Sequence, residues 1–310
     1  MNRITPLVWF IGCLALTATA SAQVRKLHTR DLTRLSQVQT ADYLTRNDVI
    51  FIPIGAVETN GIMPSDRDYV FPLAFAMAMA ENADALYMPG LMWSYPGTTL
   101  VAPSTIYISP SVGAAHLKTL AKSLLRQGFR RQVWLAYGQG PATLTGGTLA
   151  REFFDETQVP ILFVDLDHYL PRVKPSVDFK TKALYGSHYM TGRIEDLPLK
   201  GDYGPSESRA AGEIPVNVGL AALSKLGFAG SLALGSWIPD LMAHGGNAKL
   251  PETAAEREEW GKQGADEMRA VVSRMKLTEA MAALREHDKF TQEVIIPKLG
   301  KFMVAPSDHR

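Results

Sequence analysis

Three carboxylates and one guanidinium group stand within eleven residues of each other in a chain of 310 residues: Glu58, Asp66, Arg67 and Asp68. Two carboxylates that lie close together repel each other, so that one of them can keep its proton while the other is ionised. Such a pair can serve as general acid and general base, and carboxylate oxygens are also ligands of hard divalent cations. This segment is therefore the first candidate for a catalytic or metal-binding site, with Glu58 and Asp68 as its central residues.

A second polar loop occurs further along the chain. The first loop follows the apolar run 49–54, and the second, at 137–142, follows the run 132–136 and contains Tyr137 and Gln139. Continuous apolar runs of this length are typical of strands buried on both faces of a parallel sheet. The carboxyl ends of parallel strands share one edge, and ligands of open α/β sheets bind there. We therefore expect the two loops to contribute to one site.

The polar residues also have simpler interpretations. Asp66 and Asp68 could cap the helix predicted after them, because a carboxylate there accepts hydrogen bonds from the first backbone N–H groups. Glu58 lies further from that helix start. Trp93 and Tyr95, which follow a short predicted strand, could stack on a flat ligand or pack in the core. These alternatives stay open from the sequence.

Strands and helices alternate along the sequence around the two loops. Alternation of this kind predicts the α/β fold class, with a single three-layer domain and a mainly parallel sheet flanked by helices. The polar stretch 171–205 has no clear periodicity and is predicted to be a long functional loop or interface arm. The predicted strands are 49–54, 85–88, 132–136, 159–164 and 231–234, and the predicted helices are 69–83, 110–126, 148–156, 207–226 and 252–275.

Composition excludes several classes of protein. The 32 basic and 31 acidic residues leave a formal charge of +1, which provides no general attraction for nucleic acid or anionic membranes. A single cysteine excludes a disulfide framework and a cysteine-based metal site. Met1–Ala22 has a basic start, an apolar stretch and a small-residue end, which predict a signal peptide and export to the periplasm or medium. The mature chain, 23–310, is then expected to be one domain that contacts no membrane.

The two loops and their surroundings resemble the creatininase family, the creatinine amidohydrolase-like metal hydrolases. That family has an apolar strand followed by Pro-x-Gly-x-x-Glu-x-His-Gly, and residues 53–61 are PIGAVETNG. Its Gly-Phe-Arg-Arg and Asn-Gly-His-Gly-Gly-Asn segments are similar to 128–131 and 137–142, and a later motif is similar to 210–217. The resemblance runs in order from Val49 to Met275 and implies a creatininase-like fold.

The resemblance also implies where a metal site would lie. The family binds two divalent metals through a Glu, an Asp, two His and a further acidic residue. Glu58 and Asp68 stand at two of these positions, whereas Asn60 and Gln139 replace the histidines and Pro215 replaces the later acid. A carboxamide oxygen is a far weaker ligand for zinc or manganese than an imidazole. The site is therefore expected to be rewritten or reduced, with at best one divalent cation on Glu58 and Asp68.

Two functions are compatible with this pattern. The first is an exported hydrolase of a small cyclic amide or another C–N bond, with Glu58 and Asp68 as the acid–base pair. The second is a non-catalytic creatininase-fold protein that binds a small polar ligand or forms part of a periplasmic assembly. In either case Asn60, Gln139, Tyr137 and Arg67 are expected to bind the substrate or ligand. The resemblance further implies a homo-oligomer.

Other chemically capable residues have weaker support. Asp165, Asp167 and His168 follow a predicted strand, and a helix cap with a surface histidine is the favoured interpretation. His188 lies in the predicted central loop without a partner that the sequence identifies. His244 begins a His-Gly-Gly-Asn stretch that is interpreted as a turn or, alternatively, as a site element. Either histidine could complete a metal site that the loops alone do not.

Overall fold

The computed structural model describes residues 27–96, 104–138, 146–176, 178–203, 218–226 and 249–303. Four parallel strands form the centre of the described chain in the order β2-β1-β3-β4. Ile54 pairs with Ala136, so that the loops after β1 and β3 begin level with each other at one edge of the sheet. The α/β prediction is confirmed. The strands are β1 (Val49–Ile54), β2 (Leu86–Tyr87), β3 (Arg131–Ala136) and β4 (Leu162–Asp165).

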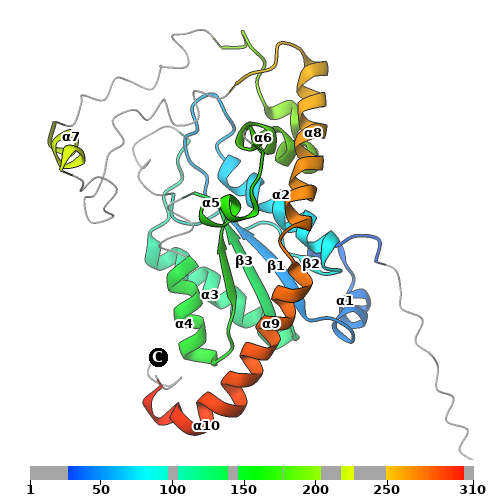
Figure 1. Ribbon diagram of the computed structural model, residues 1–310, viewed down its shortest axis with the longest axis vertical. Helices are drawn as coiled ribbons and strands as arrows, with labels where there is room; N and C mark the ends of the chain where they lie inside the picture. Colours follow the sequence, from blue (N-terminus) through cyan, green and yellow to red (C-terminus); the bar gives the residue numbers. More distant parts are fainter. Residues whose placement is uncertain are drawn as a thin grey trace, which may run out of the picture.

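Helices cover both faces of the sheet, as predicted for a three-layer domain (Figure 1). Successive strand side chains point to opposite faces, and Phe51 and Ile52 accordingly belong to different core clusters. The Phe51 side is covered by α2 (Arg67–Asn82), α6 (Phe179–Met190), α8 (Ala254–Ser273) and α9 (Leu277–Phe290). The Ile52 side is covered by α1 (Gln37–Leu44), α3 (Pro110–Gln127) and α4 (Gly147–Thr157).

The remaining elements are short, and no helix among the described residues is long and apolar enough to cross a membrane. The predicted signal peptide and the predicted strand 231–234 fall outside the described residues, as does most of the predicted helix 207–226. The short elements are α5 (Leu166–Tyr169), α7 (Val218–Lys225), α10 (Ile296–Leu299), the 3₁₀ turns η1 (Leu32–Arg34), η3 (Leu170–Val173), η4 (Ile194–Asp196) and η8 (Gly300–Phe302), and the π-helical turn η7 (Thr291–Ile295).

The prediction of a long loop at 171–205 was wrong, because α6 occupies its middle. The helix lies in the core against α8, and the two backbones approach at Gly186 and Gly264. A Cβ atom at Gly186 would stand 2.3 Å from the backbone carbon of Gly264. Glycine disfavours a helix by about 1 kcal/mol relative to alanine in isolation. Gly186 therefore weakens the helical pattern of this segment, and packing against α8 stabilises the helix.

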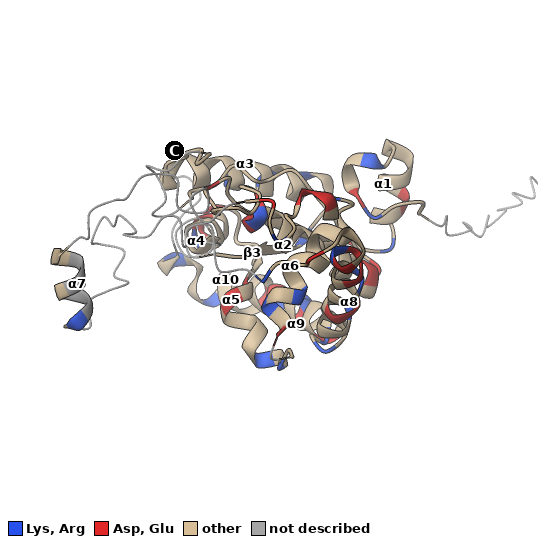
Figure 2. Cartoon of the chain, turned by 90° about the horizontal axis from the view of Figure 1, so that it is seen from above, with Lys and Arg blue, Asp and Glu red and all other residues tan. Residues whose placement is uncertain are grey.

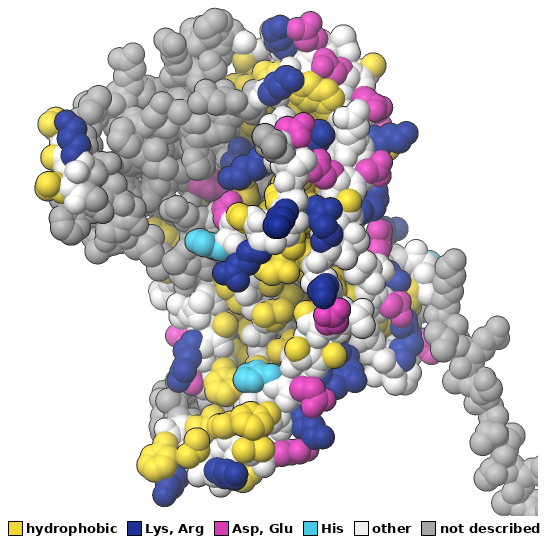
Figure 3. Space-filling model, in the orientation of Figure 1, with side chains coloured by type: hydrophobic (Ala, Val, Ile, Leu, Met, Phe, Trp, Pro, Cys, Tyr) yellow, Lys and Arg dark blue, Asp and Glu magenta, His cyan; other side chains and the backbone are white. Residues whose placement is uncertain are grey.

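Acidic and basic residues are interspersed along the described helices (Figure 2). Hydrophobic side chains gather at the lower end of the molecule, over α9 and α10 (Figure 3). Phe290, Leu299 and Phe302 are exposed there. This end lies beyond the amino ends of the strands, away from the edge where β1 and β3 open into their loops.

Candidate functional site

The loop after β1 is held to the first turn of α2 by a close approach at Gly55. A Cβ atom there would lie 2.5 Å from the Cα atom of Tyr69, so no larger residue fits without displacing the helix. The backbone carbonyl of Gly55 accepts hydrogen bonds from the backbone N–H and the hydroxyl of Ser94. Asp68, next to Tyr69, is thereby placed beside the end of β1.

Asp68 lies buried at the edge where the two loops meet. Its residue is 3% exposed, and its Oδ1 atom lies 3.5 Å from Nε of Arg67. Its Oδ2 atom faces Gly138, since a Cβ atom at Gly138 would stand 3.7 Å from it. Gly138 has φ +88°, a conformation that glycine adopts without strain. The expected meeting of the two loops is confirmed for Asp68 and Gly138, whereas Gln139 lies outside the described residues.

Asp167 joins the same edge from α5, the short helix that follows β4 directly. Gly138 donates its backbone N–H to Oδ2 of Asp167 at 3.3 Å. Asp165 caps α5 by accepting the N–H of Asp167, and the His168 side chain is 81% exposed, so the predicted cap and surface histidine are confirmed. That interpretation missed the Asp167 carboxylate, which turns back toward the loop after β3.

Burial shifts the pKa values of two side chains at this edge, Asp167 and Tyr137. Burial raises the pKa of Asp167, and the neighbouring carboxylates of Asp165 and Asp68 raise it further. The backbone N–H of Gly138 and the ammonium group of Lys180 lower it in part. Burial and the charge of Asp167 also raise the pKa of Tyr137 to about 12, so its hydroxyl is neutral at physiological pH. Tyr137 packs on Phe71 with ring centroids 4.3 Å apart. The edge thus joins two carboxylates in different surroundings.

A cavity of about 240 Å³ opens beside Asp167. The described residues of its walls are mainly apolar, with one carboxylate and one ammonium group among them. A cavity of this size suits a small ligand rather than a peptide or a nucleotide. The residues that line it are Phe71, Tyr137, Asp167, Leu170, Pro171, Pro175, Ser176, Phe179 and Lys180.

Glu58 and Asn60 lie buried in the loop between β1 and α2. Glu58 is 5% exposed and donates its backbone N–H to the carbonyl of Ser65. Asn60 is 1% exposed and donates from Nδ2 to the carbonyl of Glu58 at 3.3 Å. Its Oδ1 atom has no hydrogen-bond partner among the described residues. Asn60 therefore presents a buried acceptor at the position where the family resemblance implies an imidazole.

His188 is buried on α6 rather than lying in a loop. Its Nδ1 atom lies 3.0 Å from the carbonyl oxygen of Leu184, to which it must donate, so that Nε2 carries the lone pair. Nε2 has no partner in the described part of the chain. Burial lowers the pKa of His188, which keeps the ring neutral. His244 lies outside the described residues.

Several other sequence candidates have structural roles. Asp66 does not cap α2 with its side chain but pairs with Arg193, whose NH2 group lies 3.1 Å from Oδ1, and so ties α2 to the end of α6. Trp93 is 48% exposed, so the core-packing alternative was wrong for it. Tyr95 stacks edge-to-face on Tyr107.

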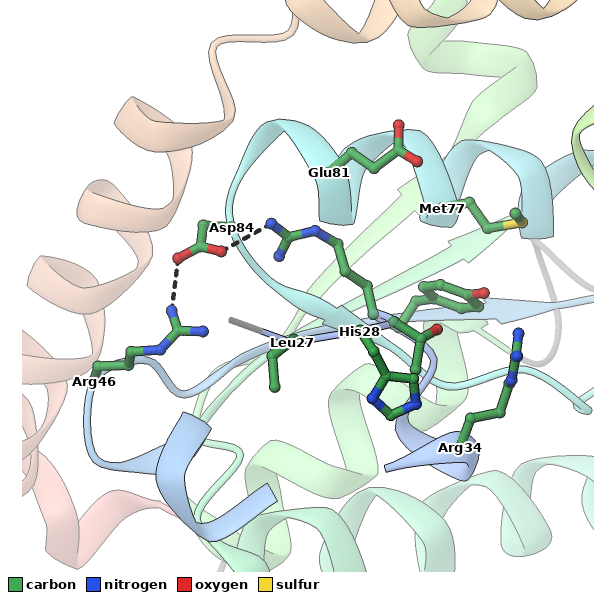
Figure 4. A pocket seen from close by; sticks show the side chains of 10 residues that line it. Leu27, His28, Arg34, Arg46, Met77, Glu81 and Asp84 are labelled. Carbon is green, nitrogen blue, oxygen red and sulfur yellow. Dashed lines mark hydrogen bonds and ion pairs between the residues drawn. The ribbon is translucent and has the colours of Figure 1, made fainter. Parts of the chain in front are cut away.

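A larger cavity, of about 660 Å³, lies beside β2, where Arg46 and Asp84 precede the amino ends of β1 and β2 (Figure 4). Asp84 points between two guanidinium groups, 2.9 Å from Arg30 and 2.6 Å from Arg46. Arg30 also donates to the carbonyl of Ala85. These contacts fasten the start of β2 and the chain before α1, so we assign them a structural role.

The described donor set differs from the two-metal centre that the family resemblance implies. The described residues contain no group of three or more His, Cys, Asp and Glu side chains placed to hold a metal ion. The buried atom that Asn60 offers without a partner is a neutral amide oxygen, which suits an N–H or water donor better than zinc or manganese. The described residues therefore do not fit a two-metal centre.

Comparison with known proteins agrees with the fold. Residues 33–169, which contain all four strands and both loops, match the family "Creatininase: Creatinine amidohydrolase". No curated protein sequence matches the chain.

Solved creatininases share the arrangement at low sequence identity. A creatinine amidohydrolase (creatininase) is 15% identical over 79% of this chain and 96% of its own, with a TM-score of 0.51. A structure named "Creatininase Mn" and a mutant creatininase of Zn–Zn type are each 15% identical over 84% of this chain and 98% of their own. Their TM-scores are 0.51 and 0.52 respectively. Residues 33–169 thus match the creatininase family, and the chain shares its fold with solved creatininases.

Proposed function

We propose that this protein is an exported hydrolase that opens a small cyclic amide, or cleaves another C–N bond, at the edge formed by Asp68, Gly138 and Asp167. One observation carries the proposal: a buried carboxylate of α2 and a second carboxylate from α5, which follows β4 directly, both face the single residue Gly138. The family match, to creatinine amidohydrolase, supports a C–N bond as the target.

The two carboxylates supply the two proton transfers that amide hydrolysis needs. Asp68, which pairs with Arg67, accepts a proton from the water that attacks the amide carbon. Asp167, whose pKa burial raises, donates a proton to the nitrogen as the C–N bond breaks. One C–O bond forms, one C–N bond breaks, and the proton gained by Asp68 balances the proton lost by Asp167. Carboxylates in different surroundings are suited to these opposite roles.

The metal requirement of this site is proposed to be smaller than that of the family. The family resemblance assigns Glu58 and Asp68 to two of the ligand positions, and two carboxylates would hold at most one hard cation such as Mg²⁺. Asn60 is proposed to orient the substrate through its buried Oδ1 atom. Three further points stay predictions: that Gln139 binds the substrate, that the protein is exported and that it forms a homo-oligomer.

The function is tested by incubating the purified protein with small lactams, hydantoins and creatinine and following ring opening by mass spectrometry. Turnover of at least one cyclic amide is expected. Binding without turnover, seen as a rise in melting temperature with any of these compounds, would instead support the non-catalytic alternative.

Asp167→Asn is expected to slow hydrolysis by about 100-fold, because the leaving nitrogen loses its acid, and to raise Tm at pH 7. The raised pKa means that the folded state binds the Asp167 proton more tightly than the unfolded state, so ionisation costs stability as pH rises through the folded pKa. Asn avoids this cost and still accepts the Gly138 N–H.

The stabilisation of Asp167→Asn is therefore expected to shrink toward zero below about pH 4, where unfolded aspartate is protonated. Calorimetry at pH 7 and pH 4 beside measurement of kcat provides the test. An unchanged kcat would remove Asp167 from the chemistry, and a variant less stable than wild type at pH 7 would show a structural role.

A further inference from the structure

The ammonium group of Lys180 stands at the cavity without an ion partner in the described part of the chain. Lys180 lies in the first turn of α6, is exposed, and lines the cavity beside Asp167. Among the described residues it forms no ion pair, although it is near enough to Asp167 to oppose the rise in that residue's pKa. Lys182, two positions on, differs in this respect because it pairs with Asp178 at 3.2 Å and Glu267 at 3.8 Å.

The rest of the cavity suits a small flat ring. Phe71 and Tyr137 pack against each other with ring centroids 4.3 Å apart. Both rings line the cavity, as does the ring of Phe179. Flat conjugated groups such as amides pack well on aromatic surfaces. The volume, about 240 Å³, leaves room for one ring with a short substituent.

We propose that this cavity selects cyclic amides that carry a carboxylate on the ring: Lys180 pairs with the carboxylate, the aromatic side chains contact the ring, and Asp167 faces the amide nitrogen. The reaction in this inference rests on the proposed function, whereas the preference for an anionic ring rests on Lys180 and the cavity. A neutral ring leaves the ammonium without a partner, and an anionic one gains a charge-assisted hydrogen bond.

Matched pairs of compounds separate the effect of charge from that of the ring. Hydrolysis of 5-oxoproline is compared with that of 2-pyrrolidinone, and hydantoin-5-acetic acid with hydantoin. The wild type is expected to favour the carboxylated member of a pair by about tenfold or more in kcat/KM, the range expected for a hydrogen bond to a charged group. Lys180→Met is expected to abolish this preference and Lys180→Arg to keep most of it.

Lys182→Met is the control for general surface charge, and it is expected to keep the wild-type preference because Lys182 does not line the cavity. If the wild type and Lys180→Met show the same preference for the carboxylated compounds, the inference is overturned, whereas the proposed hydrolase function is not affected.

If none of the compounds is hydrolysed, the proposed function fails, and calorimetric binding of the same pairs then decides the inference. A preference for the carboxylated compound that Lys180→Met removes supports it. Binding without that preference, or no binding of any pair, overturns it.

Discussion

Asp68→Asn is expected to lower kcat by about 10²- to 10⁴-fold, the range that removal of a general base produces. The amide keeps the shape of the side chain and can still contact Arg67, but it cannot accept a proton from water. Asp68 is buried at the meeting point of the two loops, where its carboxylate faces Gly138. The loss is expected in kcat for every substrate that the wild type hydrolyses.

Asp66→Asn is the matched control, since Asp66 lies two positions earlier and pairs with Arg193 instead of facing Gly138. It is expected to lower Tm, because α2 loses an ion pair to the end of α6, while kcat changes by less than about threefold. Circular dichroism establishes that both variants fold. Loss of activity in Asp66→Asn with retention in Asp68→Asn would reverse the assignment.

Gly264→Ala is expected to cost about 3 kcal/mol or more of the free energy of unfolding, at the upper end of the usual cost of overpacking. A Cβ atom at Gly264 would lie 1.9 Å from the carbonyl oxygen of Lys182 and 2.8 Å from the backbone N of Gly186. Both neighbours are backbone atoms of α6, so relief requires the two helices to move apart. Movement of α6 would also shift Phe179 and Lys180 at the cavity.

Gly147→Ala provides the comparison, because no atom of the described residues lies within 4 Å of a Cβ atom there and the residue begins α4. A helical Gly→Ala exchange without a clash is expected to be neutral or to stabilise by up to about 1 kcal/mol. Urea unfolding of the two variants and the wild type gives the free energies. Equal stability of the two variants would mean that α6 and α8 do not cross as closely as described.

The sheet and most of its helices could be predicted because local patterns agree with the tertiary structure. Val49–Ile54 is apolar throughout and lies buried on both faces, and Gly128 ends α3 with φ +109°. The shared edge of the two loops followed from parallel strand order alone. These features depend on periodicity and turn chemistry, which a single sequence contains.

The parts that could not be predicted depend on contacts between distant segments. The helix α6 is stabilised by its crossing with α8, and Gly186, which permits that crossing, weakens the local pattern. Asp167 has the spacing of an ordinary cap neighbour, and only the three-dimensional arrangement shows its carboxylate accepting the N–H of Gly138.

The most direct test of the central claim is the rate of ring opening of the cyclic amides by wild-type protein that has been dialysed exhaustively against EDTA, with residual metal measured by elemental analysis. We predict that turnover persists with far less than one equivalent of zinc, manganese or iron, and that Asp68→Asn abolishes it under the same conditions. Turnover that disappears on chelation and returns with zinc or manganese would contradict a carboxylate-based mechanism. It would show that residues beyond Glu58 and Asp68 complete a metal centre.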